Sequence, residues 1–325
     1  MEQRLLGTTG LTVSALGFGA GAVGGLMVRG EAADQARAVA RAIEAGITYF
    51  DTAPGYGDGL SEENLGRALR AVAGWGRVVV GTKVRVSPAD LADPAAAVRR
   101  SCEVSLRRLG RERVDLLQVH NQVGVGADVL TAEVYAGPVA EALRRLVEAG
   151  LIGHLGFTGM GDTQAIHAVV GARVFATVQS YFNALNPSAG FAGASGGGQD
   201  FAGLIDAAAG NGLGVINIRP FAAGAMTGVE ERHPLAGGAG GPAMAGTAYT
   251  ADLARARALA SLAVELGLSG PLELALRFAL TKVGVSTVLV GYSDLAQLEQ
   301  AIAWAERGPL SVAAQQRVVE AARRP

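Results

Sequence analysis

The feature that most constrains the fold is a strict alternation of short apolar runs with segments of helical period. The apolar runs span 15–19, 47–52, 78–84, 114–120, 154–159, 176–182, 214–220 and 286–291. The helical segments span 34–45, 61–72, 94–108, 138–149, 162–170, 200–209, 251–266 with 271–281, and 294–305. Strands that are apolar throughout are typical of a parallel sheet buried on both faces. Eight strand–helix units without an evident break favour an α/β fold of the closed (β/α)8 TIM-barrel type over a doubly wound sheet.

Three further segments complete this expected architecture. Residues 4–15, "RLLGTTGLTVSA", predict an N-terminal β-hairpin that closes the bottom of the barrel. Long Gly/Ala-rich βα loops follow strands 6 and 7, over 183–199 and 228–248, and would lie on the C-terminal face where barrel sites form. They are interpreted either as disordered surface loops or as a substrate lid. We expect residues 1–325 to form a single barrel domain.

A glycine pattern near the start of the chain tests the alternative of a dinucleotide-binding Rossmann fold. "GAGAVG" (Gly19 to Gly24) fits G-x-G-x-x-G, but 47 glycines in 325 residues make short glycine patterns frequent. A Rossmann loop needs its helix to begin at the third glycine, so that free N–H groups face the phosphates. Here "GLMVRGEAA" (25–33) intervenes. The pattern therefore predicts a flexible loop after strand 1 and not a Rossmann site.

Charge and cysteine content exclude several classes of function. The net charge of −1 and the lack of a basic stripe argue against nucleic acid as a partner. No run approaches the roughly 18 apolar residues of a membrane-spanning helix, and the first residues carry no secretion signal. A single cysteine, Cys102, excludes an internal disulfide and fits a reducing compartment. We expect a cytoplasmic protein whose partner is a small molecule, with an oligomeric state that the sequence does not reveal.

Polar residues at the ends of three neighbouring apolar strands are the candidates for chemistry. Asp51 ends strand 2, Lys83 ends strand 3 and His120 ends strand 4, while Tyr56 lies in the loop after strand 2. Lys83 is one of two lysines in a chain whose other basic residues are arginines. Because the strands are adjacent and parallel, these four side chains should meet at one rim of the barrel. A lysine buried there is costly unless it is paired.

Elementary electrostatics gives this cluster a role. A tyrosine hydroxyl has an ordinary pKa of about 10, which is too high for ready proton donation at neutral pH. An ammonium beside it lowers that pKa, because it favours the phenolate. An aspartate would fix and balance the ammonium, and a histidine would orient a carbonyl oxygen. The result is an acid facing a carbonyl, which still needs a source of electrons.

Four segments carry a resemblance to a known family: "DTAPGYGDGLSEENLGRAL" (51–69), "VVVGTKV" (78–84), "SLRRLGRERVDLLQVHN" (105–121) and "LIGHLGFTGM" (151–160). In order and spacing they resemble the signature blocks of the aldo-keto reductases, from about residue 3 to 305. The resemblance implies a barrel that binds NADPH or NADH without a Rossmann motif. It implies hydride transfer to a carbonyl carbon, with Tyr56 as the acid and Lys83 as its partner. Asp51 would be the counter-ion of the lysine, and His120 would orient the substrate.

The same resemblance implies a set of cofactor contacts. They are Gly19, Ala20, Asp51, Thr158, Gly159, Gln179, Ile218, Arg219, Pro220, Phe221, Gly291, Ser293, Gln297 and Gln300. Thr158, Gly159 and Gln179 would lie at the carboxamide, although relatives often have Ser-Asn at the first two positions. Ile218 replaces an aromatic platform, and Arg219 replaces a common serine and adds a cation suited to pyrophosphate.

The cofactor block after strand 8, "VGYSDLAQLEQAI" (290–302), departs from the family pattern. Ser293 and Gln297 fit, but Gln300 and Ala301 stand where a Glu-Asn pair is usual, and no Lys or Arg is present to bind a 2′-phosphate. The resemblance favours NADP(H), and NAD(H) is the alternative. A substrate pocket is expected from Val23, Met27, Tyr56, Phe182 and the two long loops.

Two other functions remain open, and several residues are assigned no function. Lys83 could form a Schiff base in an aldolase-type lyase, or the barrel could hold a nicotinamide nucleotide as a non-catalytic sensor. His154, His167 and His233 share no metal-ligand spacing and are interpreted as structural, as is Cys102 inside a helix. Ser61 is predicted to be the N-cap of the helix after strand 2.

Overall fold

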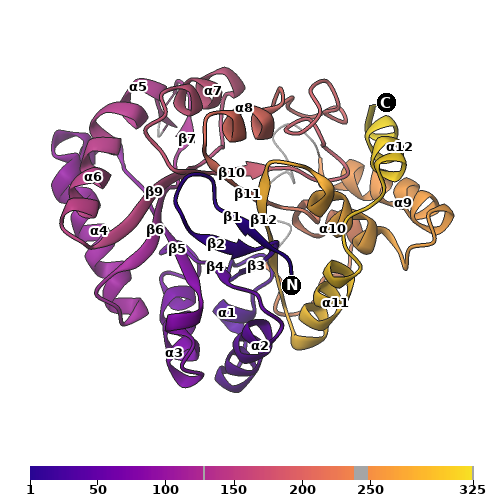
Figure 1. Cartoon of the computed structure of the whole chain (residues 1–325), viewed down its shortest axis with the longest axis horizontal. Helices are drawn as coiled ribbons and strands as arrows, with labels where there is room; N and C mark the ends of the chain where they lie inside the picture. Colours follow the sequence, from indigo (N-terminus) through magenta and orange to yellow (C-terminus); the bar gives the residue numbers. More distant parts are fainter. Residues whose placement is uncertain (127–128, 238–247, 324–325) are drawn as a thin grey trace.

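A computed structural model of the chain describes residues 1–126, 129–237 and 248–323. Eight parallel strands close into a barrel, with helices around it (Figure 1). The strands, in chain order, are β3 (Leu16–Gly19), β4 (Tyr49–Asp51), β5 (Val79–Val84), β6 (Val114–Val119), β9 (Ile152–Thr158), β10 (Thr177–Tyr181), β11 (Gly214–Ile218) and β12 (Val285–Gly291). The predicted (β/α)8 fold is confirmed, and the Rossmann alternative is excluded.

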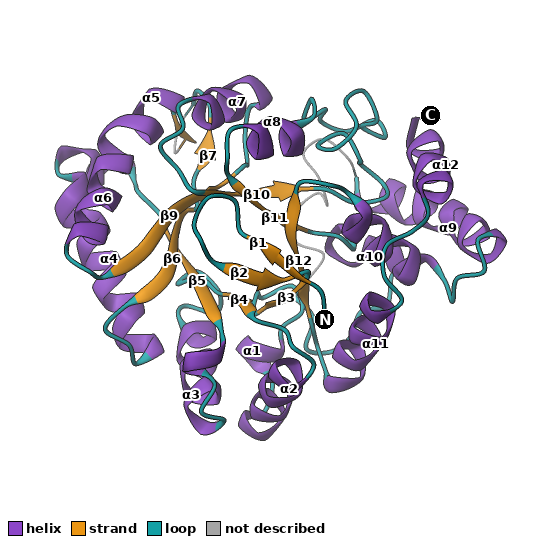
Figure 2. Ribbon diagram, in the orientation of Figure 1, coloured by secondary structure: helices purple, strands orange, loops and turns teal. Residues whose placement is uncertain are grey.

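The helices form an outer layer around the strands (Figure 2). The barrel helices are α2 (Ala32–Glu44), α3 (Leu60–Ala71), α4 (Pro94–Leu109), α6 (Ala140–Glu148), α7 (Thr163–Gly171), α8 (Leu204–Gly210), α9 (Tyr249–Glu265), α10 (Pro271–Thr281) and α11 (Leu295–Glu306). The sequence pattern did not predict α1 (Leu26–Arg29), α5 (Ala132–Val134), the π-helical turn η3 (Tyr135–Val139) or α12 (Val312–Arg323). The first three are only three to five residues long, whereas α12 buries Ala314, Val318 and Ala322 at helical spacing and could have been predicted.

The N-terminal hairpin covers one end of the barrel, as predicted. Strand β1 (Gln3–Leu5) pairs antiparallel with β2 (Thr12–Ser14), and Figure 1 looks onto this end. Leu6 and Val13 are fully buried against barrel residues that include Tyr49 and Ile216. Water is thus excluded at the amino ends of the strands, and the carboxyl ends remain for a site.

The register of the barrel brings the polar candidates together. Asp51 pairs with Gly81 of β5, Lys83 pairs with Gln118 of β6, and Thr158 pairs with Gln179 of β10. Side chains at alternate positions of such strands point into the barrel. The interior near the carboxyl ends is therefore polar, whereas the opposite end is filled by apolar side chains.

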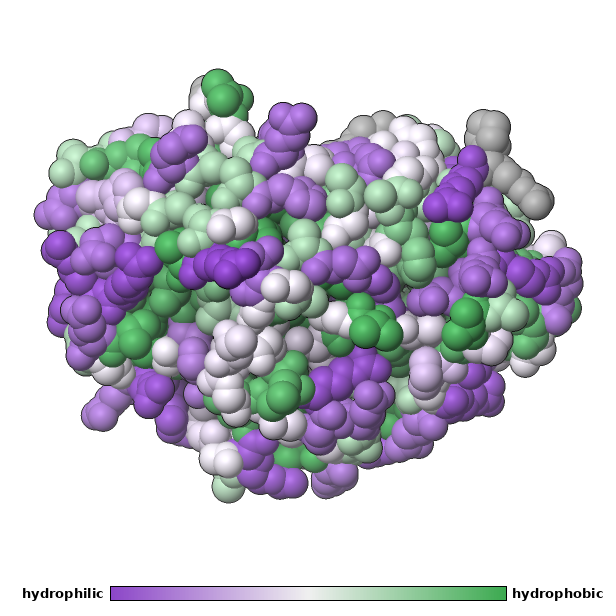
Figure 3. Space-filling model, turned by 45° about the horizontal axis from the view of Figure 1, so that its top comes forward, coloured by the Kyte–Doolittle hydropathy of each residue, from purple (hydrophilic) through white to green (hydrophobic). Residues whose placement is uncertain are grey.

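One face of the surface shows how hydrophobic residues are distributed. On the face seen in Figure 3, hydrophobic residues form small separate spots among hydrophilic ones. Within the described ranges, no helix combines the length and the apolar composition needed to cross a bilayer.

Candidate active site

A buried ion pair lies at the centre of the site. Asp51 is 2% exposed at the end of β4, and Lys83 is 1% exposed on β5. The Lys83 ammonium donates to Oδ1 of Asp51 and, over 2.8 Å, to the backbone carbonyl of Thr52. An isolated charge at this depth would be strongly destabilising, so each residue depends on the other.

The second carboxylate oxygen of Asp51 is held by neutral donors from three strands. Oδ2 accepts from Tyr49 Oη at 3.2 Å, from Gln118 Nε2 at 3.0 Å and from Gln179 Nε2 at 2.8 Å. Both carboxylate oxygens are therefore occupied, and the aspartate can only accept. This arrangement fixes the carboxylate in place and, through it, the ammonium of Lys83.

Tyr56 lies directly over this pair. The Lys83 nitrogen is 4.8 Å from the centre of the Tyr56 ring. Burial by itself lowers the pKa of Lys83, but the attraction of Asp51 and Tyr56 outweighs burial and raises the net pKa above its ordinary value. The lysine therefore stays charged, and its positive charge faces the Tyr56 ring.

The loop that carries Tyr56 is shaped by three successive left-handed residues. Gly57, Asp58 and Gly59 have φ of 64°, 51° and 95°, which turns the chain sharply into α3. The predicted N-cap at Ser61 is wrong, because Gly59 holds that position and Ser61 lies inside the helix. The Ser61 hydroxyl instead donates to the carbonyl of Ala20 at 2.8 Å, which joins this helix to the loop after β3.

His120 completes the cluster at the end of β6. Its ring stands edge-on to the Tyr56 ring, with 6.2 Å between centres and 88° between planes. Burial, followed by the charges of Lys83 and Arg85, lowers the pKa of His120 to about 3. The imidazole is therefore neutral at physiological pH and has one N–H available to a ligand oxygen.

A cavity of about 470 Å³ opens above the cluster. Tyr56, His120 and Asp51 line it, while Lys83 lies beneath its floor. The predicted cofactor contacts that line it are Gly19, Asp51, Thr158, Gln179, Ile218, Arg219, Pro220, Phe221, Gly291, Ser293, Gln297 and Gln300. Ala20 and Gly159 are outside this lining.

Several of these residues have partners that the sequence pattern did not predict. Gln179, expected at a carboxamide, donates to Asp51, and Thr158 donates to Gln179 over 3.3 Å. The Ser293 hydroxyl donates to the carbonyl of Gly24 at 2.6 Å, and the Ser293 backbone N–H donates to the side-chain oxygen of Gln297. Ser293 therefore ties the loop after β3 to the end of β12.

Residues from distant segments also line the cavity and were missed by the sequence analysis. They are Met160, Tyr181, Glu231, Arg232, His233, Tyr249, Leu272, Tyr292 and Trp304. Tyr181 follows the predicted Gln179 by two positions on the same strand, so the alternation of β10 could have identified it. Residues 231–233 belong to the loop after β11, and no local sequence pattern predicts the path of that loop.

The part of this loop that the structure describes crosses the mouth of the cavity. Gly237 donates to the carbonyl of Ala22, Arg29 donates to the carbonyl of Leu235, and His233 Nε2 lies 3.4 Å from the Asp294 carboxylate. Residues 238–247 of the predicted 228–248 loop lie outside the described residues. The described part joins the β11 side of the cavity to the β3 loop and to α11.

The other predicted loop does not form a lid. Most of 183–190 is buried, and none of 183–199 lines the cavity above the cluster. Phe182 is fully buried and stacks on Phe278 at 5.0 Å, and Met27 is 1% exposed beneath the surface. The expectation that Phe182, Met27 and this loop line a substrate pocket is wrong, because apolar packing takes them into the core. Val23 and Tyr56 do line it.

Unsatisfied donors indicate what the cavity can hold. Nη1 of Arg219 and Nε of Arg232 are buried and have no hydrogen-bond partner among the described residues. The turn between them is strained, with φ of 57° at Arg219, 48° at Ala222 and 55° at Ala223. Guanidinium groups with open donors beside exposed glycine backbone suit phosphate or carboxylate oxygens. An elongated nucleotide with a pyrophosphate fits this chemistry.

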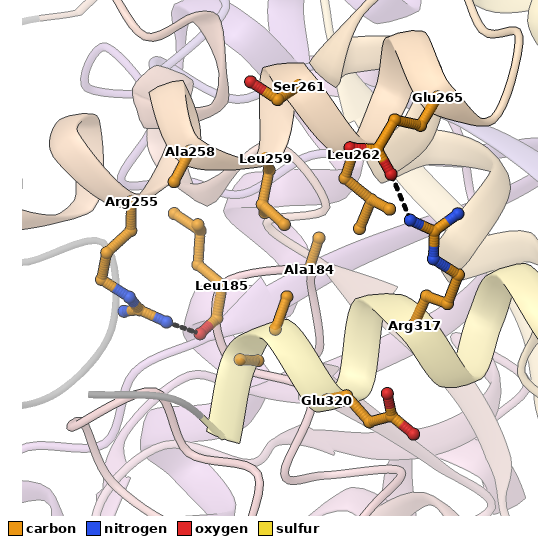
Figure 4. A pocket seen from close by; sticks show the side chains of 12 residues that line it. Ala184, Leu185, Arg255, Ala258, Leu259, Ser261, Leu262, Glu265, Arg317 and Glu320 are labelled. Atoms are coloured by element: carbon orange, nitrogen blue, oxygen red, sulfur yellow. Dashed lines mark hydrogen bonds and ion pairs between the residues drawn. The ribbon is translucent and has the colours of Figure 1, made fainter.

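A second hollow lies elsewhere, between α9, α12 and residues 184–185 (Figure 4). Its volume is about 400 Å³. Arg255 points to the backbone carbonyl of Leu185, and Arg317 pairs with Glu265. Its arginines are thus already engaged by the protein, and no cluster of chemical groups like that above Lys83 faces it.

Comparison with known proteins gives one consistent answer. The model of the "Aldo/keto reductase family" matches residues 15–323. The chain is 30% identical to L-galactose dehydrogenase of Arabidopsis thaliana over 309 residues, 93% of this chain and 88% of that protein. It is 33% identical to D-threo-aldose 1-dehydrogenase of a Pseudomonas species over 185 residues, 49% of this chain and 54% of that protein. In structure it resembles a Bacillus halodurans aldo-keto reductase in its holo form, with a TM-score of 0.74 at 24% identity and coverage of 99% and 96%.

Proposed function

Because the chain belongs to the aldo/keto reductase family, we propose that this oxidoreductase uses NAD(P)(H) to interconvert an aldehyde, ketone or aldose with its alcohol. Tyr56 is the general acid and base of this proposal. The observation that carries it is the position of the Lys83 ammonium, fixed by Asp51 on one side and directed at Tyr56 on the other. That position makes a phenol into a usable proton donor at neutral pH.

The nicotinamide ring, when bound, supplies or accepts the hydride at its C4 atom. During reduction, Tyr56 donates its proton to the carbonyl oxygen as the carbon gains the hydride, so an alkoxide never accumulates. Lys83 stabilises the phenolate that this transfer leaves behind. Neutral His120 donates its N–H to the same oxygen and orients the carbonyl. In the direction of oxidation, the Tyr56 phenolate removes the hydroxyl proton.

The residues proposed to hold the nucleotide form two groups, one for the nicotinamide end and one for the pyrophosphate. Thr158 and Gln179 lie beside the cluster and would hold the carboxamide, and Ile218 would lie against the ring. Arg232, with its free Nε, would bind the pyrophosphate. These assignments combine the family resemblance with the unsatisfied donors of the cavity.

The choice between the two nucleotides is part of the proposal. The family resemblance favours NADP(H). Among the described residues that line the cavity, Arg219 and Arg232 are the only lysine or arginine side chains. If both serve other anions, no cation is left for a 2′-phosphate, and NAD(H) becomes the alternative.

The dehydrogenase relatives support a sugar-like or aldehydic substrate. Their names state L-galactose and D-threo-aldoses as substrates. We extend this class to the present chain as a proposal, with 1–325 as one barrel domain acting in the cytoplasm on a small molecule.

The two other functions considered from the sequence have less support. A Schiff-base lyase needs a neutral, accessible lysine amine, whereas Lys83 is 1% exposed, paired with Asp51 and has a raised pKa. A non-catalytic nucleotide sensor would not need the Tyr56, Lys83 and His120 arrangement. Neither is favoured by a specific observation.

The test of the proposal separates nucleotide binding from turnover. The purified protein is titrated with NADH and with NADPH by fluorescence, and nucleotide consumption is then followed with a panel of aldehydes, ketones and aldoses in both directions. Tyr56→Phe should reduce turnover by about 10²- to 10⁴-fold and leave the nucleotide Kd unchanged. A matched control, Tyr135→Phe, removes a hydroxyl that donates to the Asn121 carbonyl outside the cavity lining and should change turnover less than about threefold. Full turnover by Tyr56→Phe would contradict the proposal.

A further inference from the structure

We infer that Arg219, stacked against Tyr181, binds an anionic group of the substrate, a carboxylate or a phosphate next to the reacting carbonyl. The inference rests on the proposed function, since it names the substrate class of the same site. It makes the preferred substrate a charged aldehyde, ketone or sugar derivative instead of a neutral one.

The first argument is the unsatisfied charge of Arg219. This residue directly follows β11 and lines the cavity. Its Nη1 is buried without an acceptor, and no carboxylate of the described residues lies within ion-pair distance of its guanidinium. Most other half-buried arginines of the described chain pair with a carboxylate, as Arg277 does with Glu273 at 2.9 Å, whereas Arg232, whose Nε also lacks a partner, does not. A buried N–H of a guanidinium without an acceptor is unfavourable unless a ligand supplies one.

The second argument is the direction in which the side chain lies. The Arg219 guanidinium carbon is 5.7 Å from the centre of the Tyr181 ring, on the neighbouring strand β10. The strand order is β10, β11, β12, and the nucleotide contacts expected at Gly291 and Gln297 come from the β12 side. The Arg219 side chain is therefore directed toward β10 and away from β12, the strand on whose side the adenosine half of a nucleotide would lie.

Tyr181 links Arg219 to the reaction centre. Burial raises the pKa of Tyr181, the charge of Arg219 lowers it, and Tyr56 raises it. The Tyr181 hydroxyl thus lies within electrostatic range of both the guanidinium and the proposed catalytic phenol. An anion held by Arg219 and a carbonyl positioned at Tyr56 and His120 would lie in the same cavity, with Tyr181 also in its lining.

The third argument is backbone strain. Arg219 has φ of 57°, a left-handed conformation that favours glycine or asparagine over arginine. The conformation is held by its own carbonyl, which accepts from Asn183 Nδ2 at 3.1 Å and from the Ala222 amide at 2.9 Å. Backbone strain at a residue that lines a cavity is a feature that clusters at functional sites, and Arg219 combines it with an unpartnered Nη1, which distinguishes it from Arg173.

The planar guanidinium fork matches the two oxygens of a carboxylate or phosphate. The pyrophosphate of the nucleotide has the same chemistry and is the other possible source of the anion. We assign the anion of the substrate to Arg219, because its side chain is directed toward β10. We assign the pyrophosphate to Arg232, because the neighbouring His233 contacts Asp294 at the start of α11.

The test uses two aldehydes that differ in one charged group, 4-carboxybenzaldehyde and benzaldehyde. We expect the wild-type kcat/KM to be at least tenfold higher for the carboxylated aldehyde. Arg219→Asn should abolish this ratio, and Arg219→Lys should keep part of it. The nucleotide Kd of both variants should stay within about twofold of wild type. Arg173→Asn is the matched control, because Arg173 also has a left-handed backbone (φ 55°) but precedes β10 at the opposite end of the barrel.

Two further measurements keep the test independent of turnover. Calorimetry of the protein–nucleotide complex with 4-(hydroxymethyl)benzoate and with benzyl alcohol measures the same preference by binding, even if neither aldehyde is reduced. The Tm of Arg219→Asn should equal or exceed that of wild type, because asparagine tolerates the left-handed backbone. A lower Tm with an unchanged ratio would indicate a structural role and overturn the inference.

The remaining outcomes are also decisive. If Arg219→Asn raises the nucleotide Kd tenfold or more and leaves the aldehyde ratio unchanged, the guanidinium serves the pyrophosphate and the substrate assignment is overturned. An equal wild-type preference for the two aldehydes and the two alcohols overturns it as well. Absence of all turnover combined with selective binding of 4-(hydroxymethyl)benzoate would support the anion site while contradicting the proposed activity.

Discussion

The Lys83 nitrogen lies 4.8 Å from the centre of the Tyr56 ring while donating to the Asp51 carboxylate beneath it. The positive charge is therefore held on the buried side of the phenol, and the hydroxyl-bearing side chain remains at the floor of the cavity. Because Asp51 Oδ2 is fixed by three neutral donors, the ammonium cannot move away without breaking a network that spans four strands. The predictions below follow from this arrangement and from its surroundings.

Replacing Lys83 with Met should change the pH dependence of the reaction. A phenol without a neighbouring ammonium has an ordinary pKa of about 10. Oxidation of the alcohol needs the phenolate, so its rate should fall at neutral pH by about 10²-fold or more and recover as the pH is raised. Steady-state rates measured between pH 6 and 10.5 test this. An unchanged pH profile in Lys83→Met would show that the ammonium does not act on Tyr56.

The Asp51–Lys83 pair should behave as one unit in stability measurements. Asp51→Asn and Lys83→Met each leave one buried charge alone, and each should lower the free energy of unfolding by about 3–5 kcal/mol. The double variant should lose less than the sum of the two, since no unpaired charge remains. Urea unfolding of all four proteins measures this coupling. The exposed pair Arg99–Glu103 is the control, and its coupling should be below about 1 kcal/mol.

His120 should make the protein less stable in acid. Its folded pKa is about 3 because burial and two nearby cations oppose its charging, whereas the unfolded chain binds the proton below about pH 6.5. Between these values the unfolded state holds more protons, so stability is complete above pH 6.5 and falls as the pH decreases toward 3. The slope from this group is about 1.4 kcal/mol per pH unit. Urea unfolding at pH 4.5 and 7.0 should show a smaller difference in His120→Gln than in wild type, and an equal difference would contradict the shifted pKa.

Gly81→Ala should displace the side chains that hold Asp51. A β-carbon at this position would come within 2.6 Å of the Tyr49 hydroxyl and 3.2 Å of Gln118 Nε2, both of which hold Asp51. We expect a loss of about 1–3 kcal/mol in unfolding free energy together with a reduced kcat. Gly76→Ala, where no atom lies within 4 Å of the added carbon, should change neither quantity appreciably. Equal behaviour of the two variants would mean that Gly81 has no special role.

Arg232→Met should weaken nucleotide binding more than it slows chemistry. The Nε of Arg232 is buried without a partner, while its Nη1 donates to the Ala223 carbonyl and the Tyr249 hydroxyl. Loss of a charge-assisted contact to pyrophosphate should raise the Kd of both NADH and NADPH about tenfold or more. Fluorescence titration at two salt concentrations measures it, with Arg173→Met as a surface control. A Kd that does not change would remove Arg232 from the nucleotide site.

The positions of Asp51, Lys83 and His120 could be predicted because each belongs to a local pattern. Each stands at or just beyond the end of an apolar run, and parallel strands of a barrel bring their carboxyl ends to one rim. The fold could be predicted from the strand–helix alternation for the same reason, because the spacing of apolar residues and the glycines that end helices are properties of short segments. The prediction of an N-cap at Ser61 was wrong, because three successive left-handed residues, 57–59, allow the helix to begin earlier than side-chain capping suggests.

Contacts between segments far apart in the chain could not be predicted from the sequence. Gln179 bonds to Asp51 across 128 positions, and Phe182 turns into the core to meet Phe278 when it was expected in the pocket. Arg219 could be found in the sequence, but its open guanidinium and its lean toward Tyr181 follow from a backbone held by Asn183. The barrel and the polar residues that meet at its rim could be read from the sequence, because strand period and strand ends are local properties. The partners of those residues depend on how the closed barrel brings distant side chains into contact.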